Sequence, residues 1–308
     1  MTQAPAPTQD TVRRLVGSLL PDAGAGQPGG PDVRPLVRDL SVWRVGGRHV
    51  LRLAPDRDAS VRLGRELRLR DAVRPHAGVA LPVSVAHGEW ARGLACTLDT
   101  ALPGRTGEER AVSALGEADL AALLTGLREV PVGKAEALGV PRLAPRSPAR
   151  LRAAADRAAG QLGLADEFDP ARLGQLTAQA ADQLAAQPAG AVLVHHALRG
   201  GRLLVSADGR VRGVLGWSDA VVGDPAEDIA GLAIAVGAPA AVRAATLAGY
   251  GARPCLRGLW LSRCDALIRL ADRLRGLDDS PLPLLRTRLR RAWEPILLER
   301  VTELPGDD

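Results

Sequence analysis

The sequence predicts an α+β fold with two lobes, a small β-rich N-terminal lobe followed by a larger helical C-terminal lobe. Residues 33–98 read as strand, strand, helix, strand and strand, whereas most segments beyond residue 105 have a helical hydrophobic period. The chain has 308 residues and is 46% hydrophobic, so it can bury a sizeable core. We divide it into a leader helix and flexible loop (1–32), an N-lobe (33–98), a hinge (99–104) and a helical C-lobe (105–308).

The leader begins with a short amphipathic run. A helix is expected over residues 10–20, with Asp10 as its N-cap, because a short polar side chain at this position can accept a free backbone N–H. Residues 21–31 contain repeated glycine and proline and are expected to form a loop.

The N-lobe is expected to contain one helix between two pairs of strands. Over residues 59–73, apolar positions recur at helical spacing among arginines, which predicts an amphipathic helix. Gly46-Gly47 is a two-residue hairpin signal between the first two strands. The four predicted strands are 42–45, 49–53, 82–87 and 93–98.

The C-lobe is predicted to be helical apart from one β-rich island. The expected helices are 117–128, 148–160, 170–187, 224–236, 239–249, 255–276 and 284–303. Three short apolar runs form the island, at 191–194, 202–205 and 211–215. Asp208-Gly209 predicts a hairpin turn between the last two runs.

The basic residues are almost all of one kind. Of 40 basic residues only Lys134 is a lysine, and the chain has no asparagine. Both scarce types have AT-rich codons, so a GC-rich genome accounts for their loss. Any mechanism that needs an asparagine ligand is excluded, and one that needs a lysine must use Lys134. Because this residue is expected in a loop bounded by proline and glycine, it is a poor candidate for a role on a strand.

Three cysteines, Cys96, Cys255 and Cys264, are far apart and match no zinc or disulfide spacing. An odd number of cysteines, with no secretory signal at the N-terminus, predicts a protein of the reducing cytoplasm. No run of about 18 apolar residues occurs, so no membrane span is expected. Cys96 lies in a predicted strand and is expected to pack in the core.

Arginines cluster in two helical segments, which raises the question of a nucleic-acid partner. Aromatic residues make up only 2% of the chain, and no nucleic-acid-binding motif is present. We therefore expect no nucleic-acid partner and interpret these arginines as solvated helix faces. The first cluster comprises Arg62, Arg65, Arg68, Arg70 and Arg74, and the second is R-T-R-L-R-R at 286–291.

Residues 193–230 are the most informative segment. They read L-V-H-H-A-L-R-G-G-R-L-L-V-S-A-D-G-R-V-R-G-V-L-G-W-S-D-A-V-V-G-D-P-A-E-D-I-A. The segment strongly resembles the catalytic region of the aminoglycoside/macrolide phosphotransferase family. That family has a pattern like L-V-H-G-D-L-H-x-G-N-L-L-V, then D-G-R-V-x-G-V, I-D-W-x-D and G-D-P-x-x-D-x-A. The spacing holds along the whole segment without a gap.

The N-terminal part is similar as well, in V-W-R-V-G-G-R-H-V-L-R-L-A-P, in R-E-L at 65–67 and in L-P-V-S-V. The resemblance therefore covers roughly residues 33–300. It implies a protein-kinase-like fold with a ligand cleft between the lobes. It also implies transfer of phosphate from ATP or GTP to a hydroxyl group of a small molecule.

Such enzymes need a loop aspartate that accepts the hydroxyl proton, and an asparagine and a second aspartate that hold magnesium. In this sequence those three positions are Ala197, Arg202 and Gly216. Base composition cannot explain the lost aspartates, because aspartate is common elsewhere in the chain. The pattern is that of a pseudoenzyme, and these positions give no reason to expect bound magnesium.

The resemblance also assigns a phosphate-contacting basic residue on a strand and a glutamate on the next helix. The matching residues are Arg52 and Glu66. They are interpreted either as a nucleotide-binding pair or as an ordinary structural ion pair. No glycine occurs between Val33 and Arg44, so no flexible phosphate-cradling loop is expected there.

Two further loop positions depart from the family pattern. His196 stands where the pattern has glycine, and Arg199 stands where it has a second histidine. The retained His195 is expected to support the loop backbone. His196, Arg199 and Arg202 form a basic cluster where an acidic metal site would lie. This cluster is either a solvated loop or a metal-free site for a phosphate or carboxylate ligand.

Three acidic residues follow the loop. Asp219 is a weak candidate for the sole carboxylate ligand of a metal. Ordinary members of the resembled family have an aspartate at this position in addition to the metal-binding aspartate, whose position here is Gly216. Asp224, Pro225 and Glu227 match a helix N-terminus with a capping aspartate. Asp224 and Asp228 are expected to brace the loop.

Three functions remain open from the sequence. The first is a catalytically inactive relative that binds a nucleotide or small molecule in the interlobe cleft. The second is an active ATP-dependent phosphotransferase that uses rearranged carboxylates such as Asp219. The third is an interaction or scaffold protein without a ligand; the sequence names no protein partner.

Overall fold

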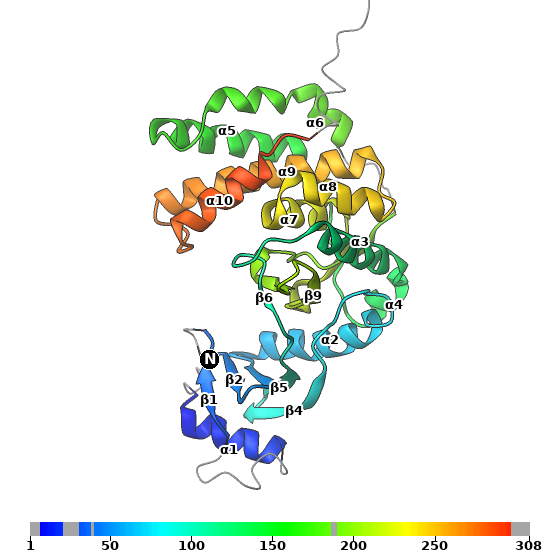
Figure 1. Ribbon diagram of the computed structural model, residues 1–308, viewed down its shortest axis with the longest axis vertical. Coiled ribbons are helices and arrows are strands. Elements are labelled where there is room, and N and C mark those ends of the chain that lie inside the picture. Colours follow the sequence, from blue (N-terminus) through cyan, green and yellow to red (C-terminus); the bar gives the residue numbers. More distant parts are fainter. Residues whose placement is uncertain (1–6, 21–30, 38–39, 186–189, 297–308) are drawn as a thin grey trace, which may run out of the picture.

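The computed structural model describes residues 7–20, 31–37, 40–185 and 190–296. It has the predicted two-lobed α+β architecture, with an antiparallel sheet in the N-lobe and mostly helices in the C-lobe (Figure 1). Helix α2 lies on the side of the N-lobe that faces the C-lobe, where it contacts residues 217–219.

The N-lobe sheet has the strand order β1-β2-β3-β5-β4, and every neighbouring pair is antiparallel. Its strands are β1 (Val33–Pro35), β2 (Val42–Val45), β3 (His49–Leu53), β4 (Ser84–Ala91) and β5 (Leu94–Thr100). The sequence prediction missed β1, which has only three residues and ends at a proline. Its core includes Leu51, Leu98 and Cys96, so the packing role expected for Cys96 is confirmed.

Two helices accompany this sheet, α1 (Gln9–Leu19) and α2 (Arg57–Val73). The N-cap of α1 is Thr8, whose hydroxyl accepts the backbone N–H of Thr11. The expectation for Asp10 was therefore wrong: it lies in the first turn, and its carboxylate pairs with Arg13.

The hairpin between β2 and β3 also differs in detail from the two-residue turn that was expected. Val45 pairs with His49, so the loop contains three residues, 46–48. Gly46 has a φ of 52°, a left-handed conformation that glycine adopts without a side-chain clash.

The C-lobe helices are α3 (Ala114–Glu129), α4 (Val132–Ala137), α5 (Pro148–Leu164), α6 (Ala178–Leu184), α7 (Ala226–Val236), α8 (Ala238–Leu247), α9 (Ala252–Leu274) and α10 (Leu282–Ala292). Short α4 was not predicted, and it carries Lys134, which is exposed on a helix and not in a loop.

Two of the predicted helices were too long. The helix expected over 170–187 is a 3-10 turn (Pro170–Gln175) followed by α6, which Thr177 caps. The helix expected over 284–303 ends at Ala292, shortly before Pro295, which cannot donate a helical hydrogen bond. The remaining parts of these predictions, 186–187 and 297–303, lie outside the described residues, as does most of the predicted loop 21–31.

The β-rich island forms two small sheets, in the orders β6-β8-β9 and β10-β7. Their strands are β6 (Arg105–Thr106), β7 (Val192–Val194), β8 (Leu203–Val205), β9 (Val211–Val214) and β10 (Val221–Gly223). A parallel bridge joins Ala80 of the N-lobe to Gly213 of β9. The island thus lies where the lobes meet.

The C-lobe core has two main clusters. One surrounds the island and includes Trp217, Ile229 and Leu120, and the other lies between α5, α9 and α10. Cys255 and Cys264 are buried free thiols. Among the described residues, no helix combines the length and the apolar character that crossing a bilayer requires.

Candidate functional site

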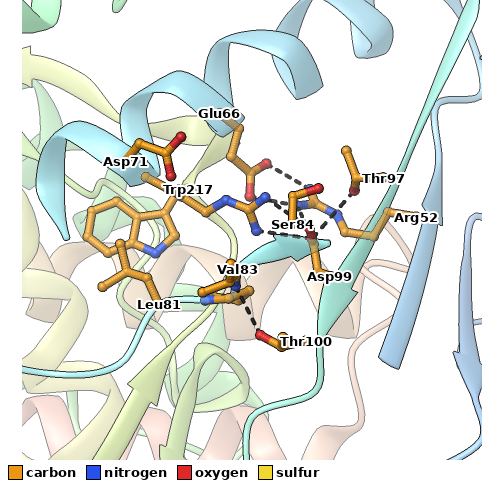
Figure 2. Close-up of polar contacts among 12 residues, drawn as sticks. Arg52, Glu66, Asp71, Leu81, Val83, Ser84, Thr97, Asp99, Thr100 and Trp217 are labelled. Atoms are coloured by element: carbon orange, nitrogen blue, oxygen red, sulfur yellow. Dashed lines mark hydrogen bonds and ion pairs between the residues drawn. The ribbon is translucent and has the colours of Figure 1, made fainter. Parts of the chain in front are cut away.

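Arg52 of β3 and Glu66 of α2 form a two-pronged ion pair. The Nη1 and Nη2 atoms of Arg52 donate to the two carboxylate oxygens of Glu66 at 2.6 and 2.8 Å (Figure 2). Burial alone would lower the pKa of Arg52 and raise that of Glu66. Their mutual attraction outweighs burial, so the pKa of Arg52 is raised and that of Glu66 is lowered. Both groups are therefore charged in the folded protein.

A second ion pair lies beside the first. Arg70 of α2, only 1% exposed, donates both terminal nitrogens to the carboxylate of Asp99 at 3.0 Å. Asp99 also approaches Arg52 to 3.9 Å and accepts from the Thr97 hydroxyl (Figure 2). The prediction that the α2 arginines are a solvated face was therefore wrong for Arg70. The two ion pairs fix α2 to β3 and β5.

His195 follows β7 and is completely buried. Its ring lies edge-on to Trp217 with centroids 4.5 Å apart, and its Nδ1 accepts the backbone N–H of Ala197 at 3.3 Å. Burial, assisted by the nearby charge of Arg202, lowers the pKa of His195 to about 3. The imidazole is therefore neutral and holds the loop from inside.

Asp228 of α7 holds the same loop from the other side. Its carboxylate accepts the backbone N–H groups of His195 and His196 at 2.7 and 2.8 Å. Burial raises the pKa of Asp228 to about 7, although the two N–H donors favour the charged form. Two ionisable side chains thus position the backbone that leads to Ala197, which is 5% exposed.

His196 has a left-handed backbone, with a φ of 63°. Glycine adopts this conformation freely, whereas a residue with a Cβ is strained by about 1–2 kcal/mol. The strain occurs at the position where the resembled pattern has glycine.

Arg202 and Gly216 contact each other directly. Gly216 has a φ of 80°, and a Cβ built on it would lie 2.8 Å from both Cζ and Nε of Arg202. The guanidinium therefore occupies the space into which any side chain at residue 216 would project. Within the described chain, Arg202 makes no side-chain hydrogen bond or ion pair.

The residues at these positions do not fit a magnesium ion. A guanidinium offers only donors and a permanent positive charge, and Gly216 offers no side-chain oxygen. Over the described ranges, no group of three His, Cys, Asp or Glu side chains could hold a metal. Asp219 is exposed, and it belongs to no such group of three.

The predicted basic cluster is divided between two places. Arg202 lies on Gly216, whereas His196 and Arg199 line a pocket of about 420 Å³ together with Asp219. Arg62 and Arg65 of α2 complete the polar lining of this pocket. No sequence pattern indicates that α2 faces the loop here, because the hydrophobic period of one helix does not reveal what lies opposite it.

Asp224 lies one position before the N-cap of α7, which is Pro225. It was therefore not the N-cap, but its carboxylate accepts the N–H of Ala226 at 2.9 Å and also binds buried Arg257. Glu227 does not close a capping box, because both of its oxygens accept from Arg146.

The comparisons with known proteins agree with this geometry. The model of the phosphotransferase enzyme family matches residues 32–259. No curated protein sequence matches the chain.

Solved structures share the fold at low identity. The GDP and kanamycin complex of APH(2")-IIia is 16% identical, with a TM-score of 0.63 over 94% of this chain and 98% of that one. The apoenzyme of macrolide 2'-phosphotransferase MphH from Brachybacterium faecium is 22% identical, with a TM-score of 0.59 over 93% and 99%. Spectinomycin phosphotransferase with ADP and spectinomycin is 11% identical, with a TM-score of 0.59 over 94% and 96%.

Proposed function

This chain belongs to the phosphotransferase enzyme family, and from that membership we propose that it binds ATP or GTP between its lobes without transferring phosphate. The observation that carries the proposal is the contact of Arg202 with Gly216. It puts a permanent cation where the family pattern has two magnesium ligands.

The N-lobe half of the proposed site supports nucleotide binding. Arg52 is held by Glu66 and keeps its side chain 26% exposed, so the guanidinium can also meet a phosphate oxygen. The similar structures with GDP and ADP make a nucleoside triphosphate the natural ligand class.

The loop half supports the absence of turnover. The methyl group of Ala197 cannot accept the proton of an attacking hydroxyl, which is the task of the loop aspartate in such enzymes. Arg202 would attract the phosphates, and it would do so without magnesium. Nucleotide binding is thus proposed to be independent of the metal.

The second candidate is an active phosphotransferase that uses Asp219. The observation in its favour is that this carboxylate is exposed beside the loop and makes no hydrogen bond within the described residues. A small molecule with a hydroxyl group, such as kanamycin or spectinomycin, would then be its acceptor. We favour the first proposal because the positions that match the two magnesium ligands are Arg202 and Gly216, and because no group of three His, Cys, Asp or Glu side chains among the described residues could hold a metal.

The proposed location is the cytoplasm, where the three buried cysteines would stay reduced. No nucleic-acid or membrane partner forms part of the proposal.

Calorimetric titration with ATP and GTP, in magnesium and in EDTA, tests the proposal. We expect equal affinity in both buffers and a loss of at least tenfold in Arg202→Ala. Arg212→Ala is the matched control, because this exposed arginine lies on neighbouring β9 and is expected to leave affinity unchanged.

Transfer to kanamycin, spectinomycin and a macrolide is measured in parallel. Magnesium-dependent transfer that Asp219→Ala abolishes would contradict the first proposal and establish the second. No binding of either nucleotide in either buffer would instead favour a ligand-free scaffold protein.

A further inference from the structure

The pocket lined by α2, the loop and residues 218–220 is a second place where positive charge gathers. We call it the α2 pocket; its volume is about 420 Å³. Neither Arg52 nor Arg202 lines it, but Asp219 of the pocket interacts electrostatically with Arg52, and Arg199 of the pocket with Arg202, so the pocket adjoins the proposed nucleotide site. Its polar side chains are those of Arg62, Arg65, His196, Arg199, Ser218 and Asp219.

Arg65 builds one wall of the α2 pocket. Its Nη2 donates to the carbonyl oxygen of Ser218 at 2.8 Å and its Nη1 to that of Gly139 at 3.3 Å. These bonds join α2 to the C-lobe through neutral acceptors, so they leave the positive charge of Arg65 without a compensating carboxylate.

The other two guanidinium groups are free to bind a ligand. Within the described chain, Arg62 and Arg199 make no side-chain hydrogen bond or ion pair. Burial lowers the pKa of Arg199, and so do neighbouring Arg269 and Arg288, while Asp219 opposes them. Those two neighbours already pair with other carboxylates, so the guanidinium of Arg199 is the one left to bind a ligand.

The charge count defines the class of ligand. Three guanidinium groups face one carboxylate, so the lining carries a surplus of two positive charges before His196 is counted. The planar guanidinium group of arginine can donate two parallel hydrogen bonds to the oxygens of a tetrahedral oxyanion. A phosphate monoester or sulfate carries close to two negative charges.

The backbone of His196 is a second, independent observation. This residue retains a left-handed conformation that strains it, although glycine would avoid the strain. Strained residues tend to persist where the side chain serves a site. Here the His196 side chain lines the α2 pocket and can donate to an anion from the loop side.

We propose that the α2 pocket binds a phosphate-type oxyanion, held by Arg62 and Arg65 from α2 and by His196 and Arg199 from the loop. Occupancy would bridge the helix that carries Glu66 to the loop that carries Ala197. The bound ion would thus strengthen the contact between α2 and the C-lobe loop. This proposal does not depend on nucleotide binding at Arg52 and Arg202.

The test measures thermal stability during titration with inorganic phosphate, sulfate and glycerol phosphate, against sodium chloride at matched ionic strength. We expect saturable stabilisation by the oxyanions only, and at least tenfold weaker binding in Arg62→Gln and Arg199→Gln. Arg68→Gln is the matched control, because this exposed arginine lies on the same helix outside the pocket. A preference for glycerol phosphate over inorganic phosphate would identify an organic monoester as the source of the oxyanion.

The variant Asp219→Asn is expected to bind the oxyanion more tightly, and a general loss of structure could not produce that result. Removing the only facing carboxylate should tighten oxyanion binding several-fold. Stabilisation no greater than that by chloride would overturn the proposal. An equal loss in Arg68→Gln would also overturn it, and so would a loss in Arg202→Gln with none in Arg199→Gln, since the anion would then occupy the nucleotide site.

Discussion

The N-lobe half and the loop half of the site differ in charge balance. On β3, β5 and α2, two arginines face two carboxylates, and each pair is two-pronged or nearly so. On the loop and the following turn, neither Arg199 nor Arg202 makes an ion pair within the described residues, and Asp219 is the one carboxylate that lines the α2 pocket. The first half is complete without a ligand, whereas the second has positive charge that an anion would neutralise. In our proposal, Ala197 and Gly216 at the two aspartate positions of the family pattern make this half a site for an anion and not for a cation.

The largest expected effect concerns the Arg52–Glu66 ion pair in the N-lobe half of the site. Arg52→Met leaves Glu66, which is 1% exposed, without its main partner, and we expect a loss of about 3–5 kcal/mol of unfolding free energy. Urea unfolding measures it. The double variant Arg52→Met/Glu66→Met leaves neither charge unpaired, so we expect it to be near wild type in stability but to have lost nucleotide affinity. Unchanged nucleotide affinity in this variant would show that the pair serves only structure.

The second effect concerns the carboxylate that holds the loop. Asp228→Asn can accept one backbone N–H but presents an NH₂ group to the other, so we expect a loss of about 1–3 kcal/mol. Urea unfolding at neutral pH measures it. Asp279→Asn, at an exposed carboxylate of the C-lobe, is the comparison variant, and an equal loss of unfolding free energy there would contradict the role given to Asp228.

Asp228 and His195 should also give opposite pH dependences. The pKa of Asp228 is raised from 3.8 to about 7, so its contribution is present at low pH and is lost as the pH rises toward 7. The pKa of His195 is lowered from 6.5 to about 3, so its contribution is present above pH 6.5 and is lost as the pH falls toward 3.

Unfolding at each pH from 4 to 7 separates the two contributions. Relative to wild type, Asp228→Asn should gain stability more steeply as the pH rises, and His195→Gln should lose it. Parallel profiles for all three proteins would show that neither group titrates as described.

The third effect concerns the contact of Arg202 with Gly216 in the loop half of the site. Gly216→Ala should cost about 1–2 kcal/mol from its left-handed backbone alone, with a further cost from the clash with Arg202. In an Arg202→Ala background only the first cost should remain. A double-mutant cycle by urea unfolding gives the coupling energy between the two positions. A coupling energy of zero would contradict the direct contact of Arg202 with Gly216.

The smallest effect tests whether His196 is retained for binding. His196→Gly should raise stability by up to about 1 kcal/mol, because glycine relieves the left-handed strain. The same variant should weaken oxyanion binding in the α2 pocket. A stabilised variant with unchanged oxyanion affinity would show that the side chain has no part in the site.

Long, strongly patterned segments were predictable from the sequence. Strands β2 and β3 begin and end at the predicted residues, and α2 was placed to within two residues of its start. Short elements such as β1, β6 and α4 were missed, because two, three or six residues carry too little periodicity to separate them from loops. The family resemblance identified Arg52 and Glu66 as a pair before their contact was known.

Contacts across the lobes could not be predicted in the same way. The α2 arginines look alike in sequence, yet Arg70 is buried against Asp99, Arg65 reaches the backbone of Ser218 and Arg68 is exposed. Likewise, the sequence alone does not connect Arg202 with Gly216, which are 14 positions apart. Only their positions in space reveal that the small residue makes room for the large one.

Lys134 has a practical consequence for all these measurements. Apart from the amino terminus, it is the single primary amine of the chain, and it is exposed on α4. Residue 139, just beyond this helix, accepts a hydrogen bond from Arg65. An amine-reactive fluorophore would therefore attach at one internal position near the α2 pocket, and its emission could follow ligand binding without a cysteine variant or an added tag.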